Sequence, residues 1–163
     1  MQIRLHACAA EAQAATRLAR AVQAGWDSVA PATWEISSSV VAAQVRDKQF
    51  TGITLQAPPL PAELATTTDL VLVVVANLDH RAGGAADPTP VTQFAAAAAE
   101  LAVPCLVLAG RSEVVRREYA DIPLTHVVAL ASDAETGNNG VVPDVEPAQA
   151  HRAAARLART WAT

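Results

Sequence analysis

Six consecutive aliphatic residues, Leu70-Val71-Leu72-Val73-Val74-Val75, stand near the middle of the 163-residue chain. The run has no polar alternation, so both of its faces have to be covered by other parts of the protein. Continuous β-branched and aliphatic runs of this length are typical of a strand inside a parallel sheet with helices on both sides. The run therefore predicts a central strand over residues 70–75.

Strand-like and helix-like segments alternate on both sides of this run. Further strands are expected at residues 3–8, 33–37, 104–109 and 126–131, with a short one at 53–55. The spacing of apolar residues predicts helices over 15–29, 91–102 and 150–161, and a shorter helix from 110–112 to about 119. Thr89 and Pro90 fit the N-cap and first turn of one of these helices, whereas residues 38–49 are ambiguous between helix and loop. The alternation predicts a single domain, residues 1–163, with a three-layer, doubly wound, predominantly parallel, Rossmann-like α/β sheet.

Composition and charge narrow the classes of partner. The formal net charge of −4 leaves no basic face for a phosphate backbone, which argues against nucleic acid. Residues 1–10 contain no apolar leader-like segment, and no run approaches 18 uninterrupted apolar residues. The sequence therefore predicts a cytoplasmic protein without a membrane partner, and it leaves open a homo-oligomer or an association with a longer paralogue.

Cysteine and histidine give no metal or redox signal. Cys8 and Cys105 lie far apart, and neither has a second Cys or His beside it at ligand spacing. Both are expected to be buried thiols. His6 and His126 lie in or at the ends of predicted strands and are expected to be structural histidines.

Several short motifs occur in an order that resembles a known family. They are Met1-Gln2-Ile3, Ala21-Val22-Gln23-Ala24-Gly25-Trp26, Asp69-Leu70-Val71, Leu78-Asp79, Ala102-Val103-Pro104, Leu108-Ala109-Gly110 and His126-Val127-Val128-Ala129-Leu130. Over residues 1–29 and 64–161 this order resembles the bacterial glycerate kinase family of the glyoxylate-pathway type. For a complete member, the resemblance implies phosphorylation of glycerate with ATP and magnesium as cofactors.

The polar residues that such a kinase uses are largely replaced. The family's first strand runs into "DSFKGS", whereas this chain continues Cys8-Ala9-Ala10-Glu11, and its only lysine is Lys48. The family's "DGGEGT" has no counterpart near residues 36–45, and of "TGEGRLD" only Leu78 and Asp79 remain. Members of the family are more than twice as long, and we expect their second lobe to have no counterpart in this sequence. Because phosphoryl transfer depends on fixed positive charge and metal ligands, we expect a glycerate-kinase-like domain without catalysis that keeps a small-molecule or protein-binding role.

Two other functions stay open at this point. One is an active glycerate kinase that uses replaced residues or a partner subunit supplying the absent lobe, with ATP and magnesium. The other is an unrelated flavodoxin-like or dinucleotide-binding domain, which would carry a flavin or NAD.

Candidate site residues follow the central strand. Asn77 and Asp79 come directly after it, and a glycine pair, Gly83-Gly84, lies a few residues further on. Asp79 is the polar residue of its motif that the resemblance retains, and it is expected to hold a metal ion or a substrate hydroxyl. The alternative is an aspartate that only caps the loop. Gly83-Gly84 is expected to let backbone N–H groups approach an anion, or else to form a plain flexible turn.

A second group, Gly110-Arg111-Ser112, follows the next predicted strand and is expected to open a helix. The free N–H groups of a helix start favour an anion, and the alternative is that Ser112 is a simple N-cap. Because ligands of open α/β sheets bind outside the carboxyl ends of the strands, both groups are expected at one edge of the domain. They predict a weak site for a small anionic metabolite, with magnesium or Arg111 offsetting the charge of Asp79.

Overall fold

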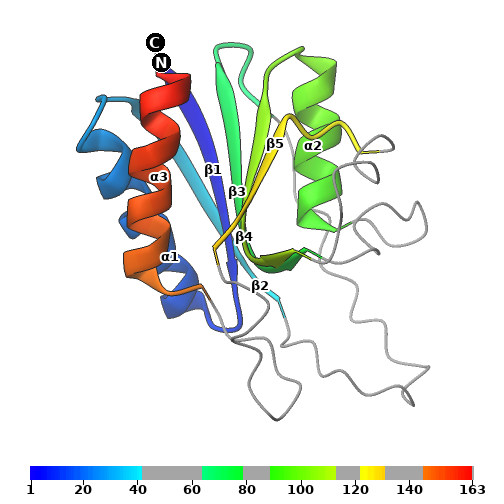
Figure 1. Cartoon of the computed structure of the whole chain (residues 1–163). Helices are drawn as coiled ribbons and strands as arrows, with labels where there is room; N and C mark the ends of the chain where they lie inside the picture. Colours follow the sequence, from blue (N-terminus) through cyan, green and yellow to red (C-terminus); the bar gives the residue numbers. More distant parts are fainter. Residues whose placement is uncertain (42–63, 79–88, 113–121, 131–144, 163) are drawn as a thin grey trace, which may run out of the picture.

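Parallel strands dominate the computed structural model, which describes residues 1–41, 64–78, 89–112, 122–130 and 145–162. These residues form β1 (Gln2–Ala9), α1 (Ala12–Asp27), β2 (Thr33–Val40), β3 (Leu70–Leu78), α2 (Pro90–Glu100), β4 (Cys105–Ser112), β5 (His126–Ala129) and α3 (Pro147–Trp161). Every strand pair is parallel, and the order across the sheet is β2-β1-β3-β4-β5. Helices α1 and α3 cover one face, and α2 covers the other (Figure 1). The predicted single Rossmann-like α/β domain is confirmed.

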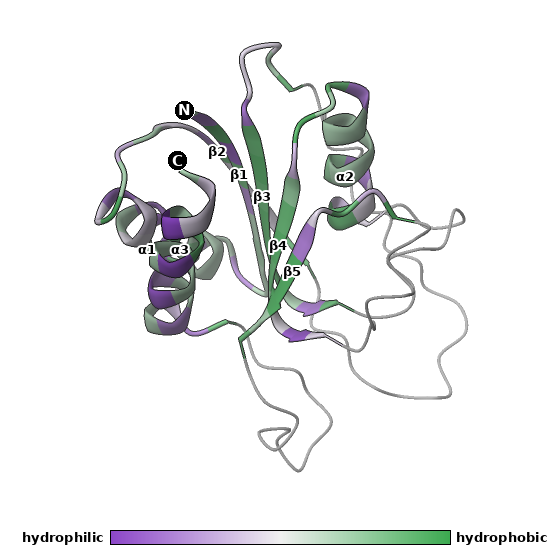
Figure 2. Ribbon diagram, turned by 45° about the horizontal axis from the view of Figure 1, so that its top comes forward, coloured by the Kyte–Doolittle hydropathy of each residue, from purple (hydrophilic) through white to green (hydrophobic). Residues whose placement is uncertain are grey.

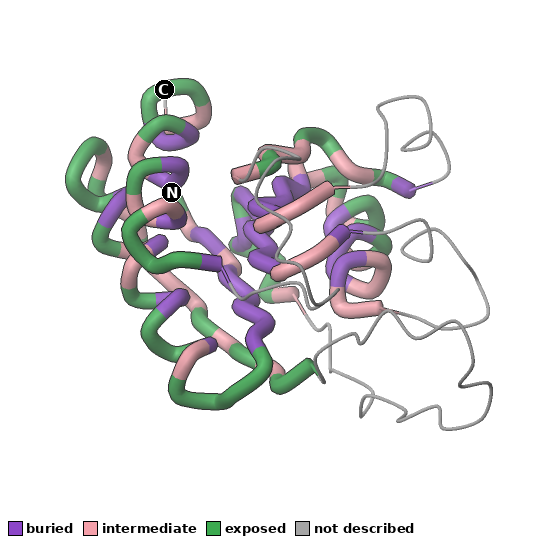
Figure 3. Tube along the Cα trace, turned by 60° about the horizontal axis from the view of Figure 1, so that its bottom comes forward, coloured by how far each residue is buried: buried purple, intermediate pink, exposed green. Residues whose placement is uncertain are grey.

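The central strand is β3, as its uninterrupted aliphatic run predicts. Residues 70–74 are fully buried, and alternate side chains serve two different cores. Leu70, Leu72 and Val74 pack with α1 and α3, whereas Val71 and Val73 pack with Phe94 of α2. The hydropathy colouring shows the same apolar centre in β3 and β4 (Figure 2), and the burial colouring shows buried residues gathered between the helical layers (Figure 3).

Three strands, β2, β3 and β4, end three residues later than local sequence signals indicate. β4 continues to Ser112, so residues 110–112 are strand and not the start of a helix, which corrects the prediction. The reason is pairing: β3 also continues past Val75, and Asn77 and Leu78 pair with Arg111 and Ser112. β2 likewise continues to Val40 because Cys8 and Ala9 of β1 pair with its last residues. The strand predicted at 53–55 and the helix predicted to reach residue 119 lie outside the described residues.

The helices follow their apolar spacing. α1 buries Ala15, Leu18, Val22 and Trp26 as predicted, but it ends at Asp27, so Val29 lies beyond it and is exposed. In the described ranges no helix combines the length and the apolar character that crossing a membrane requires.

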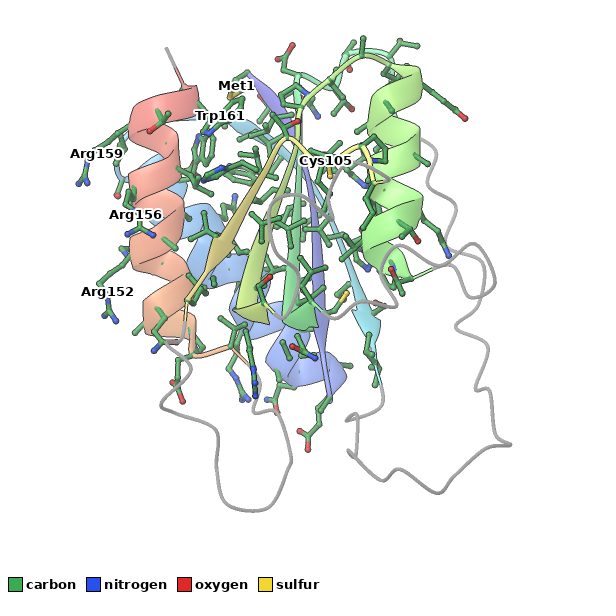
Figure 4. All side chains as sticks on the ribbon, turned by 45° about the vertical axis from the view of Figure 1, so that its right-hand side comes forward. Met1, Cys105, Arg152, Arg156, Arg159 and Trp161 are labelled. Carbon is green, nitrogen blue, oxygen red and sulfur yellow. The ribbon has the colours of Figure 1, made fainter. Side chains whose placement is uncertain are left out.

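The start of α2 also matches the expectation. The Thr89 hydroxyl accepts a hydrogen bond from the Thr92 backbone N–H at 3.2 Å, and Pro90 occupies the first turn, which confirms the predicted cap. Figure 4 shows Arg152, Arg156 and Arg159 pointing away from the sheet along the outer side of α3.

Candidate functional site

The carboxyl ends of β1, β3 and β4 meet at one edge of the sheet. β3 is parallel to β1 on one side and to β4 on the other. The prediction that the segments after Val75 and after Ala109 share one edge is therefore confirmed. β1 leads into α1 on one face, whereas the next helix after β3 lies on the opposite face. In doubly wound sheets the crevice between two such strands is the usual place for a ligand.

Four of the seven predicted site residues are described, and the sheet brings them together. Asn77 is the register partner of Arg111, Ser112 pairs with Leu78, and Gly110 precedes them in β4. Asp79, Gly83 and Gly84 lie outside the described residues, and so does the metal site predicted at Asp79. Among the residues that the structure describes, no three His, Cys, Asp or Glu side chains gather into a group that could hold a metal ion.

Asn77 and Arg111 form the most distinctive polar pair at this edge. The side-chain oxygen Oδ1 of Asn77 is buried and accepts no hydrogen bond from the described part of the chain. A buried acceptor without a donor costs about 1–3 kcal/mol, so a ligand hydroxyl or N–H that reaches it is favoured. Arg111 is half-buried next to it and carries a permanent positive charge. The pair, which we call the Asn77–Arg111 pair, suits a small molecule that has both an anionic group and a hydroxyl.

Close packing requires a glycine at position 110, on the face of β4 opposite to the Asn77–Arg111 pair. A Cβ atom at this position would lie 2.6 Å from the backbone oxygen of Ala76 and 3.1 Å from Cγ2 of Val145. Glycine thus allows the segment before α3 to approach the sheet closely. Because residues 110–112 belong to β4, the anion-binding N–H groups of a helix start are not found at these positions, which corrects that part of the prediction.

A second polar group lies on the α2 face of β1 and β2, and sequence reasoning missed it as a unit. We call it the His6 cluster: His6, Cys8, Ser37 and Ser39. His6 Nδ1 lies 2.8 Å from Ser37 Oγ, and His6 Nε2 lies 3.0 Å from Ser39 Oγ. Ser39 Oγ is also 3.4 Å from Cys8 Sγ. The register pairs His6 with Ser37 and Cys8 with Ser39, so every second residue of both strands meets on this face.

Two neighbouring side chains, those of Phe94 and Arg4, lie close to the His6 cluster. Phe94 of α2 stacks on the imidazole with 4.7 Å between the ring centroids. Arg4 lies two residues before His6 in β1 and forms an ion pair with Glu35. The guanidinium carbon of Arg4 is 5.9 Å from the centroid of the Phe94 ring. A signal for this arrangement was present in the sequence, since Arg4, His6 and Cys8 alternate in β1 as Glu35, Ser37 and Ser39 do in β2.

The chemistry of the His6 cluster fits a role in holding β1 and β2 together better than a role in catalysis. Burial, together with the nearby Arg4 charge, lowers the pKa of His6 to about 4. The imidazole is therefore neutral at pH 7, with one nitrogen donating and the other accepting, and its partners among the described residues are serine hydroxyls and not a carboxylate. Burial raises the pKa of Cys8 to about 11, so its thiol is protonated and unreactive. His6 is thus a structural histidine with both nitrogens satisfied, as expected.

The other residues singled out by chemistry do not join either group. Cys105 is a buried thiol, and burial raises its pKa to about 12. It lies in the core between the sheet and α2, where Figure 4 labels it. His126 is exposed at the start of β5.

Sequence comparisons identify no relative: the chain matches no protein-family model, and no curated protein matches its sequence significantly. The resemblance to the glycerate kinase family therefore stays a prediction from the quoted motifs. The observations that bear on function are the fold and the placement of the Asn77–Arg111 pair at the carboxyl edge of β3 and β4.

Proposed function

We propose that this chain is a glycerate-kinase-like domain that binds a small anionic metabolite at the carboxyl edge of β3 and β4. The chain does not transfer a phosphoryl group by itself. The observation that supports this most strongly is the Asn77–Arg111 pair, in which a buried acceptor lacking a described donor stands beside a permanent cation. A hydroxy acid fits both partners, because its carboxylate is attracted to Arg111 and its hydroxyl can donate to Asn77 Oδ1.

The charge at this edge supports binding better than phosphoryl transfer. Among the described residues that end β1, β3 and β4, Arg111 is the only Arg or Lys. Glu11, at the start of α1, adds a negative charge near the end of β1. Transfer of a phosphoryl group relies on several cations around the reacting oxygens, whereas loose retention of one anion needs only a single well-placed cation. The predicted aid of magnesium at Asp79 and the cytoplasmic location belong to the same proposal.

The strand order favours one competing function. The order β2-β1-β3-β4-β5 is that of flavodoxin-like sheets, which bind a flavin where β1 and β3 part. An unrelated flavin- or dinucleotide-binding domain would retain its cofactor during purification. We expect the ultraviolet-visible spectrum of the purified chain to show protein absorbance alone, and a bound flavin or NAD would favour this alternative.

The proposal predicts binding without turnover. With glycerate, ATP and magnesium, we expect a heat of binding for glycerate in calorimetry but no phosphoglycerate in a product assay. Turnover near ordinary kinase rates, about 1–100 per second, would instead establish an active kinase. Repeating the assay with a longer paralogue tests whether a partner supplies the second lobe of the kinase family, because activity that appears only in the mixture identifies a complementing subunit.

A further inference from the structure

The outer edge of β2 presents backbone groups that no described strand pairs. β2 ends the sheet, with β1 as its only neighbour in the described chain. On the side that faces β1, the backbone N–H of Thr33 donates to the backbone oxygen of Met1 at 3.0 Å, and that of Val41 donates to the backbone oxygen of Ala9 at 2.9 Å. Backbone groups alternate along a strand, so the odd-numbered residues face β1. The N–H and C=O groups of the even-numbered residues point outward; these are Trp34, Ile36, Ser38 and Val40.

The described residues of β2 lack several devices by which proteins block strand addition at a sheet edge. Its sequence, TWEISSSV, contains no proline or lysine, and its pairing with β1 is continuous, without a bulge. Glu35 is the only charged residue, and it is already paired with Arg4 of the same chain. Ile36 and Val40, both β-branched, leave 43% and 56% of their surface exposed. The strand is therefore suited to accept another strand.

We propose that β2 pairs antiparallel with β2 of a second copy of this chain, forming a two-fold dimer with one sheet continuous across both copies. Outward-facing residues have to pair with outward-facing residues, and a two-fold axis at Ser37 achieves this along the whole strand. It sets Ile36 opposite Ser38 of the second copy and Trp34 opposite Val40 of the second copy.

The axis at Ser37 pairs all four outward-facing residues of β2 with one another, and charge excludes one alternative register. With the axis at Ser37, Glu35 lies opposite Ser39 of the second copy. An axis at Glu35 would place two carboxylates directly opposite each other, and like charges facing across strands are destabilising. With the axis at Ser37, β2 can pair with itself along its whole length without like charges facing each other, as a two-fold interface requires. This inference is independent of the anion site, because β2 and β4 are not neighbours in the sheet.

Sedimentation of the full chain over a range of concentrations tests the proposal. We expect the wild type to form a dimer and Ile36→Lys to weaken the dimer at least tenfold, since it places a charge on each side of the axis. Ala99→Lys is the matched control, because Ala99 is exposed on α2, away from β2, and this variant should dimerise like the wild type.

Amide hydrogen exchange of the wild type provides a second readout that needs no variant. At concentrations that favour the dimer, the N–H groups of Ile36, Ser38 and Val40 should be protected, and dilution should expose them. The inward N–H of Ser37 should stay protected at both concentrations. A wild type that is monomeric throughout, a dimer unaffected by Ile36→Lys, or outward N–H groups that exchange freely in the dimer would each overturn the proposal.

Discussion

Gly25→Ala is expected to destabilise the protein by about 3 kcal/mol, at the upper end of what overpacking usually costs. A Cβ atom at Gly25 would lie 2.2 Å from the backbone oxygen of His151 and 2.9 Å from its Cα. These atoms belong to the backbone of α3, so no side-chain rotation can relieve the contact, and the two helices would have to separate. In an ordinary helix interior the same change is favourable by about 1 kcal/mol. The close packing of α1 on α3 is expected to reverse that sign.

Urea denaturation of Gly25→Ala measures this effect, with Ala24→Leu as its control. Ala24 is the preceding residue of α1 and is exposed, so a larger side chain there meets no helix. Leucine is a good helix former, and the control should stay within about 0.5 kcal/mol of the wild type. A Gly25→Ala variant as stable as the wild type would contradict the close approach of the two helices.

Acidification is expected to destabilise the wild type more than His6→Gln, by about 2–3 kcal/mol between pH 7 and pH 4.5. The pKa of His6 is lowered from 6.5 to about 4 in the folded protein, because burial and the Arg4 charge disfavour the imidazolium. Between these two values the unfolded chain binds a proton that the native state does not. The stabilisation is therefore complete above pH 6.5 and is lost as the pH falls toward 4.

The measurement is the free energy of unfolding of both proteins at several pH values in this window. Every other ionisable side chain is present in both proteins, so the difference between the two curves isolates the contribution of His6. Two curves that fall in parallel would show that His6 is protonated as easily in the native state as in the unfolded chain, which the buried, doubly hydrogen-bonded ring excludes.

Local sequence was sufficient where one segment determines its own structure. The aliphatic run of β3 requires cover on both faces wherever it lies, and Thr89 with Pro90 begins a helix through contacts within one turn. The shared edge of β3 and β4 also followed from sequence, because consecutive strands of an alternating α/β chain are expected to be parallel.

Contacts between segments far apart in the sequence determined the features that local sequence did not predict. Gly110-Arg111-Ser112 has the local chemistry of a turn, but pairing with the extended end of β3 keeps it in the sheet. His6 and Ser37 are 31 residues apart, and only the register of β1 on β2 shows that their side chains meet. The close contact at Gly25 likewise depends on where α3 docks. Asp79, Gly83 and Gly84, which complete the predicted site, lie outside the described residues.

Backbone and side-chain amide chemical shifts during titration with glycerate, with and without magnesium, test the anion site most directly. We predict that the largest changes occur at Asn77, Arg111 and Ser112, including the carboxamide of Asn77. Arg111→Gln should weaken the binding at least tenfold by removing the charge. Arg156→Gln is the matched control, because Arg156 is exposed on the outer side of α3 (Figure 4), and it should bind like the wild type. Unchanged shifts at these three residues, or equal affinity in Arg111→Gln, would contradict the site.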